Sequence, residues 1–567
     1  MIAALLPLLA AAQGFRAVVI PVEFGDESFK DKNKNVVEKI ASARNYFNDQ
    51  FSPSRSFSFD LLPTVKLSKD LSWYGANSSS VKDCRANELI RDACAALKND
   101  LSVYDNDGDG SIDNICIIAA GGSEADGAGV DCIWPQQLSL KERGESFVRD
   151  GKTVDSASIC VEGSGLGTFC HEFAHSLGLQ DLYDTDGNGS GGTAPGLLGT
   201  LSLMDKGSKN DGGNTPPNFC AIELEQLGLG KQVELKRGFH RLHPVGESKE
   251  YLRIDTPNPD EYFLLECRSD SGWDAFIGGR GLLVYHIDRS ANNSWYSDYY
   301  RRNLTARERW ANNQVNCRPD HQCARLLAAT PGTSKVSEVF FPLEGRTAIS
   351  AETDPSLKFW SGATSSLAID HITLESDGSV SFNVITPVVV RESLVYQDAA
   401  IFSWSVDNTL SVEDCSVGWF SQGDKSYAGT GSCQASRLQD GSFTATLEGL
   451  SPSTPYTLQI KLTCKDGSAH SYSMDFVTKS RPEHARPFIY LKSLSKREDG
   501  TYPAGERIPL RVYNATGAKQ VQWFFDDIRI APGLDGFWYL QTSGTLKAWV
   551  WYEDGSKDVI IKKMNVR

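Results

Sequence analysis

Residues 168–184 constrain this chain most, because they combine one short helical pattern with an immediate turn. At about 100° per residue, Phe169 and Phe173 fall on one face of a helix, while His171 and His175 project together from the opposite face. Two imidazoles one helical turn apart can both reach a single Zn²⁺ at about 2.0–2.1 Å. We therefore expect the fold to bury the apolar face and to leave the histidine face at a metal site.

The residues around the two histidines extend this pattern toward hydrolysis. Glu172 lies beside the remaining coordination position, where a carboxylate can take a proton from water. Gly178 suits the left-handed conformation that ends a helix, so the chain can turn back there and bring Asp181 toward the metal. The sequence therefore predicts a zinc ion held by His171, His175 and Asp181, with Glu172 as the general base.

The spacing His-Glu-x-x-His-x-x-Gly-x-x-Asp resembles the metzincin pattern, in which the third ligand is usually a histidine. Metzincins also carry a methionine turn beneath the metal, and Met204 is a candidate for it in a chain with only four methionines. The alternative is a third ligand from a later helix, for which Glu223 and Glu225 are available. Gly178 and Met204 favour Asp181, because a later-helix ligand requires neither of them.

Two acidic loops have the spacing of calcium-binding loops. Residues 105–113 carry carboxylates at loop positions one, three, five and nine, with glycines between them. The ligands predicted in this loop are Asp105, Asp107, Asp109 and Asp113. Residues 184–188 repeat the one-three-five spacing just after the active-site turn, and the ligands predicted there are Asp184, Asp186 and Asn188. The alternative for each loop is an acidic, solvated turn.

Charge and hydropathy bear on partners and location. The net charge of −15 and the lack of a long run of Lys or Arg argue against a nucleic-acid partner. Residues 2–12 form an apolar run too short to span a membrane, and Ala10-x-Ala12 resembles a signal cleavage site. We therefore predict a signal peptide at residues 1–12, with a first buried strand as the alternative. No later segment reaches 18 consecutive apolar residues, so no membrane span is predicted.

The 13 cysteines are compatible with an oxidising compartment, and their odd number leaves at least one thiol unpaired within the chain. Cys317 and Cys323 flank a short loop and are close enough in sequence to be bridged. Cys84 and Cys94 would lie about 15 Å apart along a helix, so they need other partners or none.

A chain of 567 residues should divide into about three or four domains. The early part alternates between strand and helix patterns, which favours an α/β layer. The predicted segments are strands at residues 15–24, 57–62 and 115–120 and helices at 36–51 and 86–97. From about residue 231 the pattern becomes mostly alternating, which favours a β-rich subdomain that completes a unit of residues 13–386.

The remaining sequence is typical of β-sandwiches. Residues 387–482 hold short strands at regular intervals, and the stretch ending at Tyr456 resembles the tyrosine corner of a fibronectin type III domain. Residues 483–567 form a second run of strands around Trp523, which predicts another Ig-like sandwich. Such modules serve as spacers or bind a surface ligand.

Taken together, these stretches resemble the immune inhibitor A family of bacterial secreted zinc metalloproteases. The resemblance covers roughly residues 15–386, and residues 171–184 are its most specific part. The supporting segments are residues 17–24, 105–113, 133–135, 203–205, 261–266, 281–288 and 316–328, with a helix that opens at Thr215 and ends at Gly228. The resemblance implies a multidomain protein with a metzincin-like α/β protease domain, one catalytic zinc, structural calcium and endopeptidase activity.

The predicted function is therefore hydrolysis of peptide bonds, with Glu172 assisting the attacking water. The predicted partners are protein or peptide substrates, with host proteins and glycoproteins as candidates, and the predicted location is secreted, periplasmic or cell-surface in a bacterium. The alternative is an exported adhesin in which a degenerate protease domain and the two sandwiches only bind. The intact Glu172 favours the enzyme.

Overall fold

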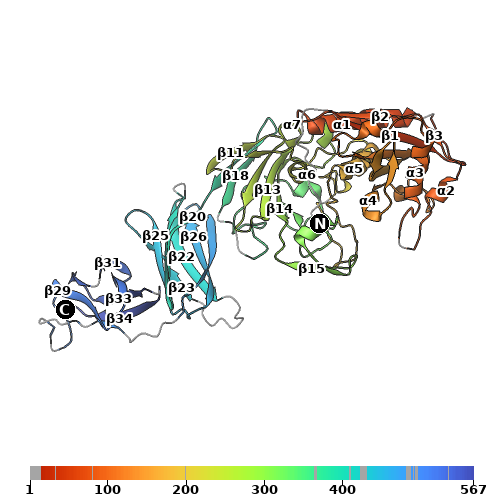
Figure 1. Ribbon diagram of the computed structural model, residues 1–567. Helices are drawn as coiled ribbons and strands as arrows, with labels where there is room; N and C mark the ends of the chain where they lie inside the picture. Colours follow the sequence, from red (N-terminus) through yellow and green to blue (C-terminus); the bar gives the residue numbers. More distant parts are fainter. Residues whose placement is uncertain are drawn as a thin grey trace. The chain divides into compact units, whose positions relative to one another are not determined.

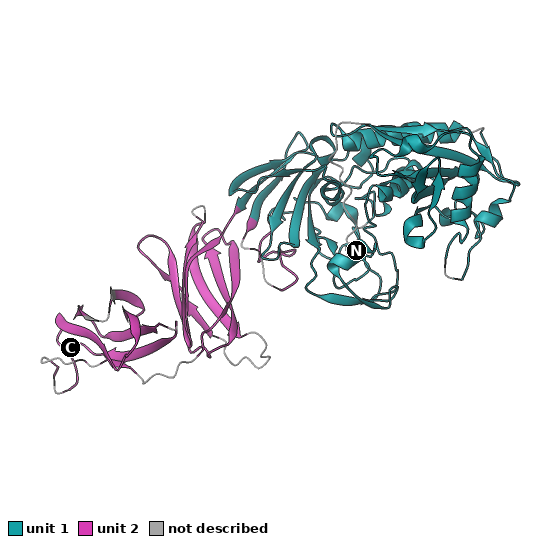
Figure 2. Ribbon diagram, viewed as in Figure 1, with its two compact units in different colours: residues 1–348, 369–384 teal, residues 349–368, 385–567 magenta. Residues whose placement is uncertain are grey.

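The computed structural model describes residues 14–31, 34–79, 81–197, 199–362, 365, 367–407, 410–421, 431–480, 487–489, 491, 496–497, 499–533, 535–553 and 555–567 (Figure 1). The predicted signal peptide, residues 1–12, lies outside the described residues. The chain forms two compact units: unit 1 contains residues 1–348 and 369–384, and unit 2 contains residues 349–368 and 385–567 (Figure 2). Over the described ranges, no helix is both long enough and apolar enough to cross a membrane.

Unit 1 is built on a mostly parallel sheet with the strand order β2-β1-β5-β9-β6, to which β3 adds by pairing with β1. Only β6 runs antiparallel to its neighbour, and it forms one edge. The strands are β1 (Phe15–Glu23), β2 (Phe57–Leu61), β3 (Val65–Lys66), β5 (Ile115–Ala119), β6 (Gln136–Ser139) and β9 (Ser156–Val161). A smaller sheet, β4-β8-β7, consists of β4 (Ser111–Ile112), β7 (Phe147–Arg149) and β8 (Lys152–Val154).

Helices cover both faces of this sheet, which explains why its central strands are continuous apolar runs. Val19 of β1 packs into the same core as α1 (Lys34–Phe51) and α5 (Leu166–Ser176). Its neighbour Val18 points to the other face and packs with α3 (Ala86–Ala96). The predicted strands and helices of this region are confirmed, with ends that differ by one or two residues. Two short helices, α2 (Leu71–Tyr74) and α4 (Leu140–Arg143), complete the layer.

The β-rich part of unit 1 begins at Lys231 and contains a sheet of order β10-β12-β13-β14-β17 and a second of order β11-β19-β18. Its strands are β10 (Lys231–Val233), β11 (Gly238–Leu242), β12 (Glu250–Asp255), β13 (Glu261–Arg268), β14 (Gly281–Asp288), β17 (Ala324–Leu326), β18 (Ala368–Leu374) and β19 (Val380–Ile385), with a hairpin of β15 (Ser294–Ser297) and β16 (Arg302–Thr305). Tyr285 and Trp310 of this part share a core with Phe173 of α5. The β-rich part therefore shares one continuous core with the helix that carries the two histidines.

Three further helices belong to this region: α6 (Ala221–Leu227), α7 (Val245–Ser248) and α8 (Ala306–Ala311). The expectation of a helix opening at Thr215 is wrong, because regular helix begins only at Ala221. The buried carboxylate of Asp274 explains the late start, because it accepts a hydrogen bond from the Asn218 N–H at 2.9 Å and holds this amide ahead of the helix. Glu266 caps the helix itself by accepting a 2.6 Å hydrogen bond from the N–H of its first residue, Ala221.

Unit 2 is all β among its described residues, and its strands form two pairs of sheets. The first pair is β20-β21-β25-β24 with β23-β22-β26-β27, made of β20 (Val388–Val395), β21 (Ala399–Val406), β22 (Val412–Ser421), β23 (Gly431–Gln434), β24 (Ser436–Arg437), β25 (Phe443–Glu448), β26 (Pro455–Cys464) and β27 (Ala469–Val477). The predicted tyrosine corner is present, since Tyr456 is fully buried and its hydroxyl oxygen accepts a 2.9 Å hydrogen bond from the Ser451 N–H.

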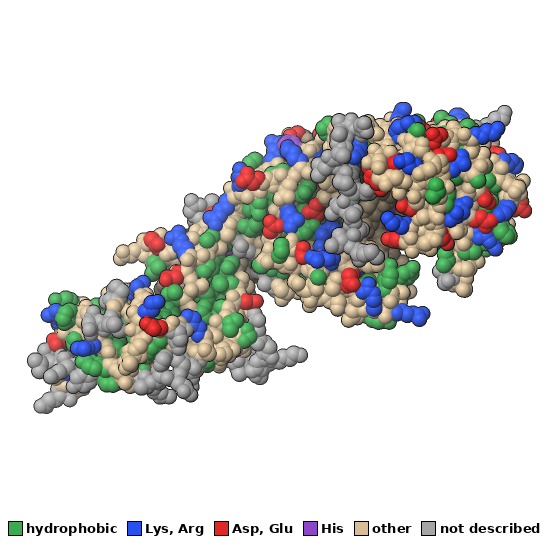
Figure 3. All heavy atoms as spheres, in the orientation of Figure 1, with side chains coloured by type: hydrophobic (Ala, Val, Ile, Leu, Met, Phe, Trp, Pro, Cys, Tyr) green, Lys and Arg blue, Asp and Glu red, His purple; other side chains and the backbone are tan. Residues whose placement is uncertain are grey.

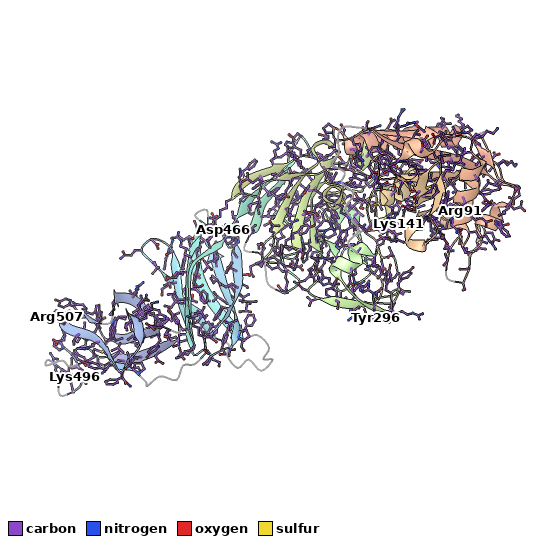
Figure 4. The ribbon with its side chains drawn as sticks, in the orientation of Figure 1. Arg91, Lys141, Tyr296, Asp466, Lys496 and Arg507 are labelled. Carbon is purple, nitrogen blue, oxygen red and sulfur yellow. The ribbon has the colours of Figure 1, made fainter. Side chains whose placement is uncertain are left out.

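The second pair of sheets in unit 2 is β28-β29-β32 with β31-β30-β33-β34, and Trp523 is fully buried in its core. Its strands are β28 (Phe488–Ile489), β29 (Glu506–Tyr513), β30 (Ala518–Phe525), β31 (Ile528–Pro532), β32 (Asp535–Leu540), β33 (Gly544–Tyr552) and β34 (Lys557–Met564). In Figure 4, Asp466 marks the first pair of sheets and Arg507 the second.

All 13 cysteines lie in described residues, and each is a free thiol. The bridge considered between Cys317 and Cys323 is therefore absent. The two side chains have different surroundings: Cys317 Sγ lies 3.1 Å from the Thr185 hydroxyl, whereas Cys323 packs into the main core of unit 1.

Candidate metal centre

His171 and His175 are oriented by backbone carbonyls. The Nδ1 atom of His171 lies 2.9 Å from the Leu203 carbonyl oxygen, and that of His175 lies 2.8 Å from the Leu179 carbonyl oxygen. A carbonyl accepts only, so both rings donate from Nδ1, and each Nε2 is the ring atom left to bind a metal. The ring centroids are 4.8 Å apart, as one helical turn requires.

Asp181 reaches the two Nε2 atoms because the chain reverses after α5. The helix ends at Ser176, and Gly178 follows with φ +102°, where the Gly178 N–H donates to the His175 carbonyl at 3.0 Å. The Oδ1 atom of Asp181 then lies 3.1 Å from His171 Nε2 and 3.3 Å from His175 Nε2. The three residues named by the sequence are thus brought to one point.

This arrangement fits a tetrahedral zinc. Two ligand atoms that are each about 2.0–2.1 Å from a tetrahedral ion lie roughly 3.3 Å from each other, which is the spacing observed here. Asp181 Oδ1 is buried and makes no hydrogen bond of good geometry, although both imidazole nitrogens are near it. A buried carboxylate oxygen without a donor is costly, and a cation between the three atoms removes that cost.

The charges of the site are strongly coupled. Burial alone would raise the pKa of Asp181, but the two imidazoles outweigh it and hold that pKa far below its usual range. Burial alone would lower the pKa of His171, but the Asp181 carboxylate outweighs it and raises that pKa to about 9. Asp181 is therefore ionised at neutral pH and favours a positive charge beside it.

Glu172 lies on α5 between the two histidines and is buried with them. Burial raises the pKa of Glu172, and the neighbouring Asp181 carboxylate acts in the same direction. A raised pKa suits a carboxylate that accepts a proton from water and later returns it. The backbone N–H of Gln137, in the edge strand β6, counteracts part of this shift by hydrogen bonding to the Glu172 carboxylate.

Met204 is fully buried, and its carbonyl accepts a 2.8 Å hydrogen bond from the Leu182 N–H. The buried carboxylate of Glu223 stabilises this turn through hydrogen bonds. Glu223 Oε1 accepts from the Ser202 hydroxyl at 2.6 Å and from the Met204 N–H at 2.9 Å, and Oε2 accepts from the Cys220 N–H at 2.7 Å. Both oxygens of Glu223 are therefore engaged away from the histidines.

Glu225, the other later-helix candidate, is also engaged elsewhere. Its Oε2 accepts a hydrogen bond from the Tyr262 hydroxyl at 2.5 Å, and its Oε1 lies 3.3 Å from Arg253 Nη1. Tyr183, by contrast, lies at the site, with its ring centroid 6.4 Å from that of His171. Burial, followed by the Asp181 charge, raises the pKa of Tyr183.

Sequence reasoning missed Asn313, which binds Asp181 through two hydrogen bonds from 132 residues away. No local pattern marks this asparagine, because its role depends on packing between distant segments.

The first acidic loop brings three of its four predicted ligands together. One carboxylate oxygen each of Asp105, Asp107 and Asp109 lies within 4.8 Å of the others. Asp113 is not in that group, and its Oδ2 accepts 2.7 Å hydrogen bonds from both the backbone and the side-chain amide of Asn106. The sequence analysis also missed Lys152, whose Nζ lies 2.6 Å from Asp105 Oδ2. Asp105 Oδ1 remains buried and without a hydrogen bond.

In the second acidic loop, Asp184 and Asp186 come together with Cys317. The side-chain oxygen of Asn188, the third ligand predicted there, accepts a 2.7 Å hydrogen bond from the Thr193 hydroxyl. Asp184 caps the loop by accepting from the Asp186 N–H at 3.1 Å and from the Ala194 N–H at 2.8 Å. This loop follows Asp181 directly in the sequence, so its conformation affects where Asp181 lies.

Acidic and basic side chains are interspersed over the face of unit 1 drawn in Figure 3, and the basic ones do not merge into one continuous patch there.

Comparison with known proteins places this centre within a recognised domain. Residues 20–229 match the sequence model of the Immune inhibitor A peptidase M6 catalytic domain. The chain is 29% identical over 238 residues to the Pre-pro-metalloprotease PrtV of Vibrio cholerae serotype O1, a match covering 35% of this chain and 25% of that protein. It is 27% identical over 291 residues to Immune inhibitor A of Bacillus thuringiensis subsp. alesti, covering 42% of this chain and 41% of that one.

The chain thus spans between a quarter and about two-fifths of the length of these curated relatives. Among solved structures, the fn3 domain of human collagen alpha-1(XX) matches 18% of this chain and 86% of that domain, at 22% identity and a TM-score of 0.15. The sheets of unit 2 are defined by the hydrogen-bonded pairing of its own strands.

Proposed function

We propose that this chain, which carries an immune inhibitor A-type peptidase M6 catalytic domain over residues 20–229, is a zinc-dependent endopeptidase that hydrolyses peptide bonds of protein substrates. The observation that carries the proposal is the convergence of His171 Nε2, His175 Nε2 and Asp181 Oδ1 at 3.1–3.3 Å, with Glu172 on the same helix. That donor set leaves a coordination position open, as catalytic zinc sites do.

Zinc held by these residues would supply Lewis-acid chemistry, acidifying a water molecule and polarising the carbonyl of the scissile peptide. Glu172 would take the proton of the attacking water and deliver it to the leaving amine. Glu172 is buried on the same helix as both histidines, so the carboxyl that carries the proton stays beside the metal site. The buried apolar core beneath α5 fixes this helix, so the base and the two histidines keep one geometry.

The proposal includes a metzincin-like fold for the catalytic domain, supported by the turn at Gly178 and the methionine turn at Met204. It also includes a signal peptide at residues 1–12, export from a bacterial cell, and a division into a protease unit of residues 13–386 and sandwiches of residues 387–482 and 483–567. The two sandwiches would act as spacers or bind a surface ligand, and the substrates would include host proteins or glycoproteins.

We further propose structural calcium in the loop of residues 105–113. Three carboxylates within 4.8 Å repel one another, and the buried, unpartnered Oδ1 of Asp105 belongs to that cluster. Lys152 neutralises only part of this charge. The loop of Asp184 and Asp186 is a second, weaker candidate, because Cys317 is a poor ligand for a hard cation.

The base assignment is tested with Glu172→Gln in the full chain. The amide cannot take a proton, so turnover of unfolded casein should fall by about 10²–10⁴-fold while one zinc per chain is retained. Glu38→Gln, a matched change at an exposed position of α1, should leave turnover unchanged. Near-normal turnover of Glu172→Gln would reject Glu172 as the base.

The adhesin alternative makes a different prediction for the parent chain. If the protease domain is degenerate and serves only binding, the zinc-loaded parent and Glu172→Gln should be equally inactive toward unfolded protein. A clear difference between the two supports the enzyme.

A further inference from the structure

We infer that Asn313 is a positioning residue that sets the geometry of the third zinc ligand, Asp181. This inference rests on the proposed function of the site. It concerns a residue that lies outside the matched peptidase domain, residues 20–229, and comes from the β-rich part of unit 1.

Asn313 contacts Asp181 through both ends of its side-chain amide. The Asp181 N–H donates to Asn313 Oδ1 at 2.7 Å, and Asn313 Nδ2 donates to Asp181 Oδ2 at 2.7 Å. The orientation of the amide follows from its partners, since a backbone N–H can only donate and an ionised carboxylate can only accept. One asparagine thus fixes the backbone and the side chain of the same residue.

The second of these bonds decides which carboxylate oxygen faces the histidines. Asn313 occupies Oδ2, and Oδ1 is the oxygen that lies near both Nε2 atoms without a good hydrogen bond. A monodentate ligand oxygen is therefore selected before the metal arrives. Aspartate has a shorter side chain than histidine or glutamate, so the backbone of an aspartate ligand must lie closer to the metal. The hydrogen bond from the Asp181 N–H to Asn313 holds that backbone in place.

Asn313 is itself held firmly. Its φ of +54° is in the left-handed region, which asparagine tolerates better than most residues with a Cβ. Its carbonyl accepts a 2.9 Å hydrogen bond from the Thr185 hydroxyl. Nearby, Asn316 Nδ2 donates to the Leu182 carbonyl at 2.8 Å and to the Ala324 carbonyl at 2.9 Å. The segment after α8 therefore holds the chain just after Asp181, at residues 182 and 185.

The physical consequence concerns metal affinity first and catalysis second. Residues that orient metal ligands change affinity or activity by about 10–100-fold when they are removed. Without Asn313, the Asp181 side chain can rotate and present either oxygen, or it can move away from the site. Metal binding would then have to order this side chain, and that loss of conformational entropy would weaken the affinity. Zinc affinity should therefore depend on a residue 132 positions from the ligand that it holds.

The test uses Asn313→Gly in the full chain, because glycine keeps the left-handed backbone accessible and removes only the amide. Asn312→Gly is the matched control: it adds a glycine to the same segment, and the Asn312 amide donates to the Glu308 carbonyl at 2.6 Å, away from Asp181. The zinc dissociation constant is measured by competition with a chromophoric chelator, and the d–d spectrum of the cobalt-substituted protein reports ligand geometry. Asn313→Ser serves as a second variant if the glycine variant does not fold.

We expect the dissociation constant to rise about 10–100-fold in Asn313→Gly, with an altered cobalt spectrum, and to stay within about twofold of the parent in Asn312→Gly. Equal affinity and identical spectra in the parent and in a folded Asn313 variant would overturn the inference, and so would equal losses in the two glycine variants. Failure of the proposed function looks different, because the parent itself would then bind no zinc or hydrolyse no peptide bond when loaded.

Discussion

Glu223 provides a test of how the methionine turn is supported. Its carboxylate is fully buried and accepts three hydrogen bonds, from the Ser202 hydroxyl and from the Met204 and Cys220 N–H groups. Glu223→Ala leaves the Ser202 hydroxyl and the Cys220 N–H without their acceptor, at a cost of about 1–3 kcal/mol each, while the Met204 N–H keeps Ser202 Oγ at 3.0 Å. The expected loss is therefore about 2–6 kcal/mol, a large share of the whole stability of many domains.

Glu223→Gln is the milder change. Its amide oxygen can keep the two bonds now made to Oε1, but its NH₂ group then faces the Cys220 N–H, so one donor is left opposed by another. The expected loss is about 1–3 kcal/mol. Unfolding in urea is followed by release of zinc to a chromophoric chelator, because this signal reports the catalytic unit and not the sandwiches. Glu225→Ala, whose carboxylate bonds to Tyr262 at the edge of the core, should cost about 1 kcal/mol.

The order of midpoints should be parent, Glu225→Ala, Glu223→Gln and Glu223→Ala. A Glu223→Ala protein that unfolds with the parent would refute the reasoning. A stable Glu223→Ala protein that binds no zinc would instead revive the later-helix ligand and remove Asp181 from the site.

Two further predictions concern unit 1. Calcium at about a hundredfold excess over its dissociation constant should raise the thermal midpoint of unit 1 by about 5 °C relative to a calcium-selective chelator, and Asp107→Asn should abolish this shift; coincident scans of the parent would favour the solvated turn. Burial raises the pKa of Asp83 to about 6, so ionising this side chain lowers the free energy of unfolding as pH rises through 6. Below the unfolded-state pKa near 3.8, this loss of stability is absent. Asp83→Asn should therefore stabilise the protein by about 1–3 kcal/mol at pH 8 and by nearly nothing at pH 4, and an equal gain at both pH values would contradict this.

Local patterns in the sequence predicted the parts of the centre that lie within one helical turn and the loop after it. The i,i+4 spacing places His171 and His175 on one face whatever the rest of the chain does, and Gly178 permits the reversal that carries Asp181 back. The strands and helices of the α/β layer were also predictable, because strands buried on both faces are continuous apolar runs.

What the sequence did not reveal depends on contacts between distant segments. Asn313 reaches Asp181 across 132 residues, and Glu223 serves the methionine turn although its position on a helix equally suited a metal ligand. Lys152 contacts Asp105 from 47 residues away, and Asp113 turns to Asn106 although the one-three-five-nine spacing included it. The helix expected from Thr215 begins only at Ala221, because the buried Asp274 carboxylate binds the Asn218 amide ahead of it. Spacing along the chain cannot predict which of two chemically suitable partners comes into contact, because tertiary packing decides it.

The central claim is that one zinc ion, held by His171, His175 and Asp181, makes this chain an endopeptidase. The most direct test is to remove the metal from the full chain, verify its removal by elemental analysis, and add zinc stepwise while hydrolysis of unfolded casein is followed. The account predicts a negligible rate without metal, a linear rise to one equivalent and a plateau thereafter, with no recovery in Asp181→Ala at one equivalent. Full activity in the verified metal-free protein, or no activity in the parent at one bound zinc, would contradict it.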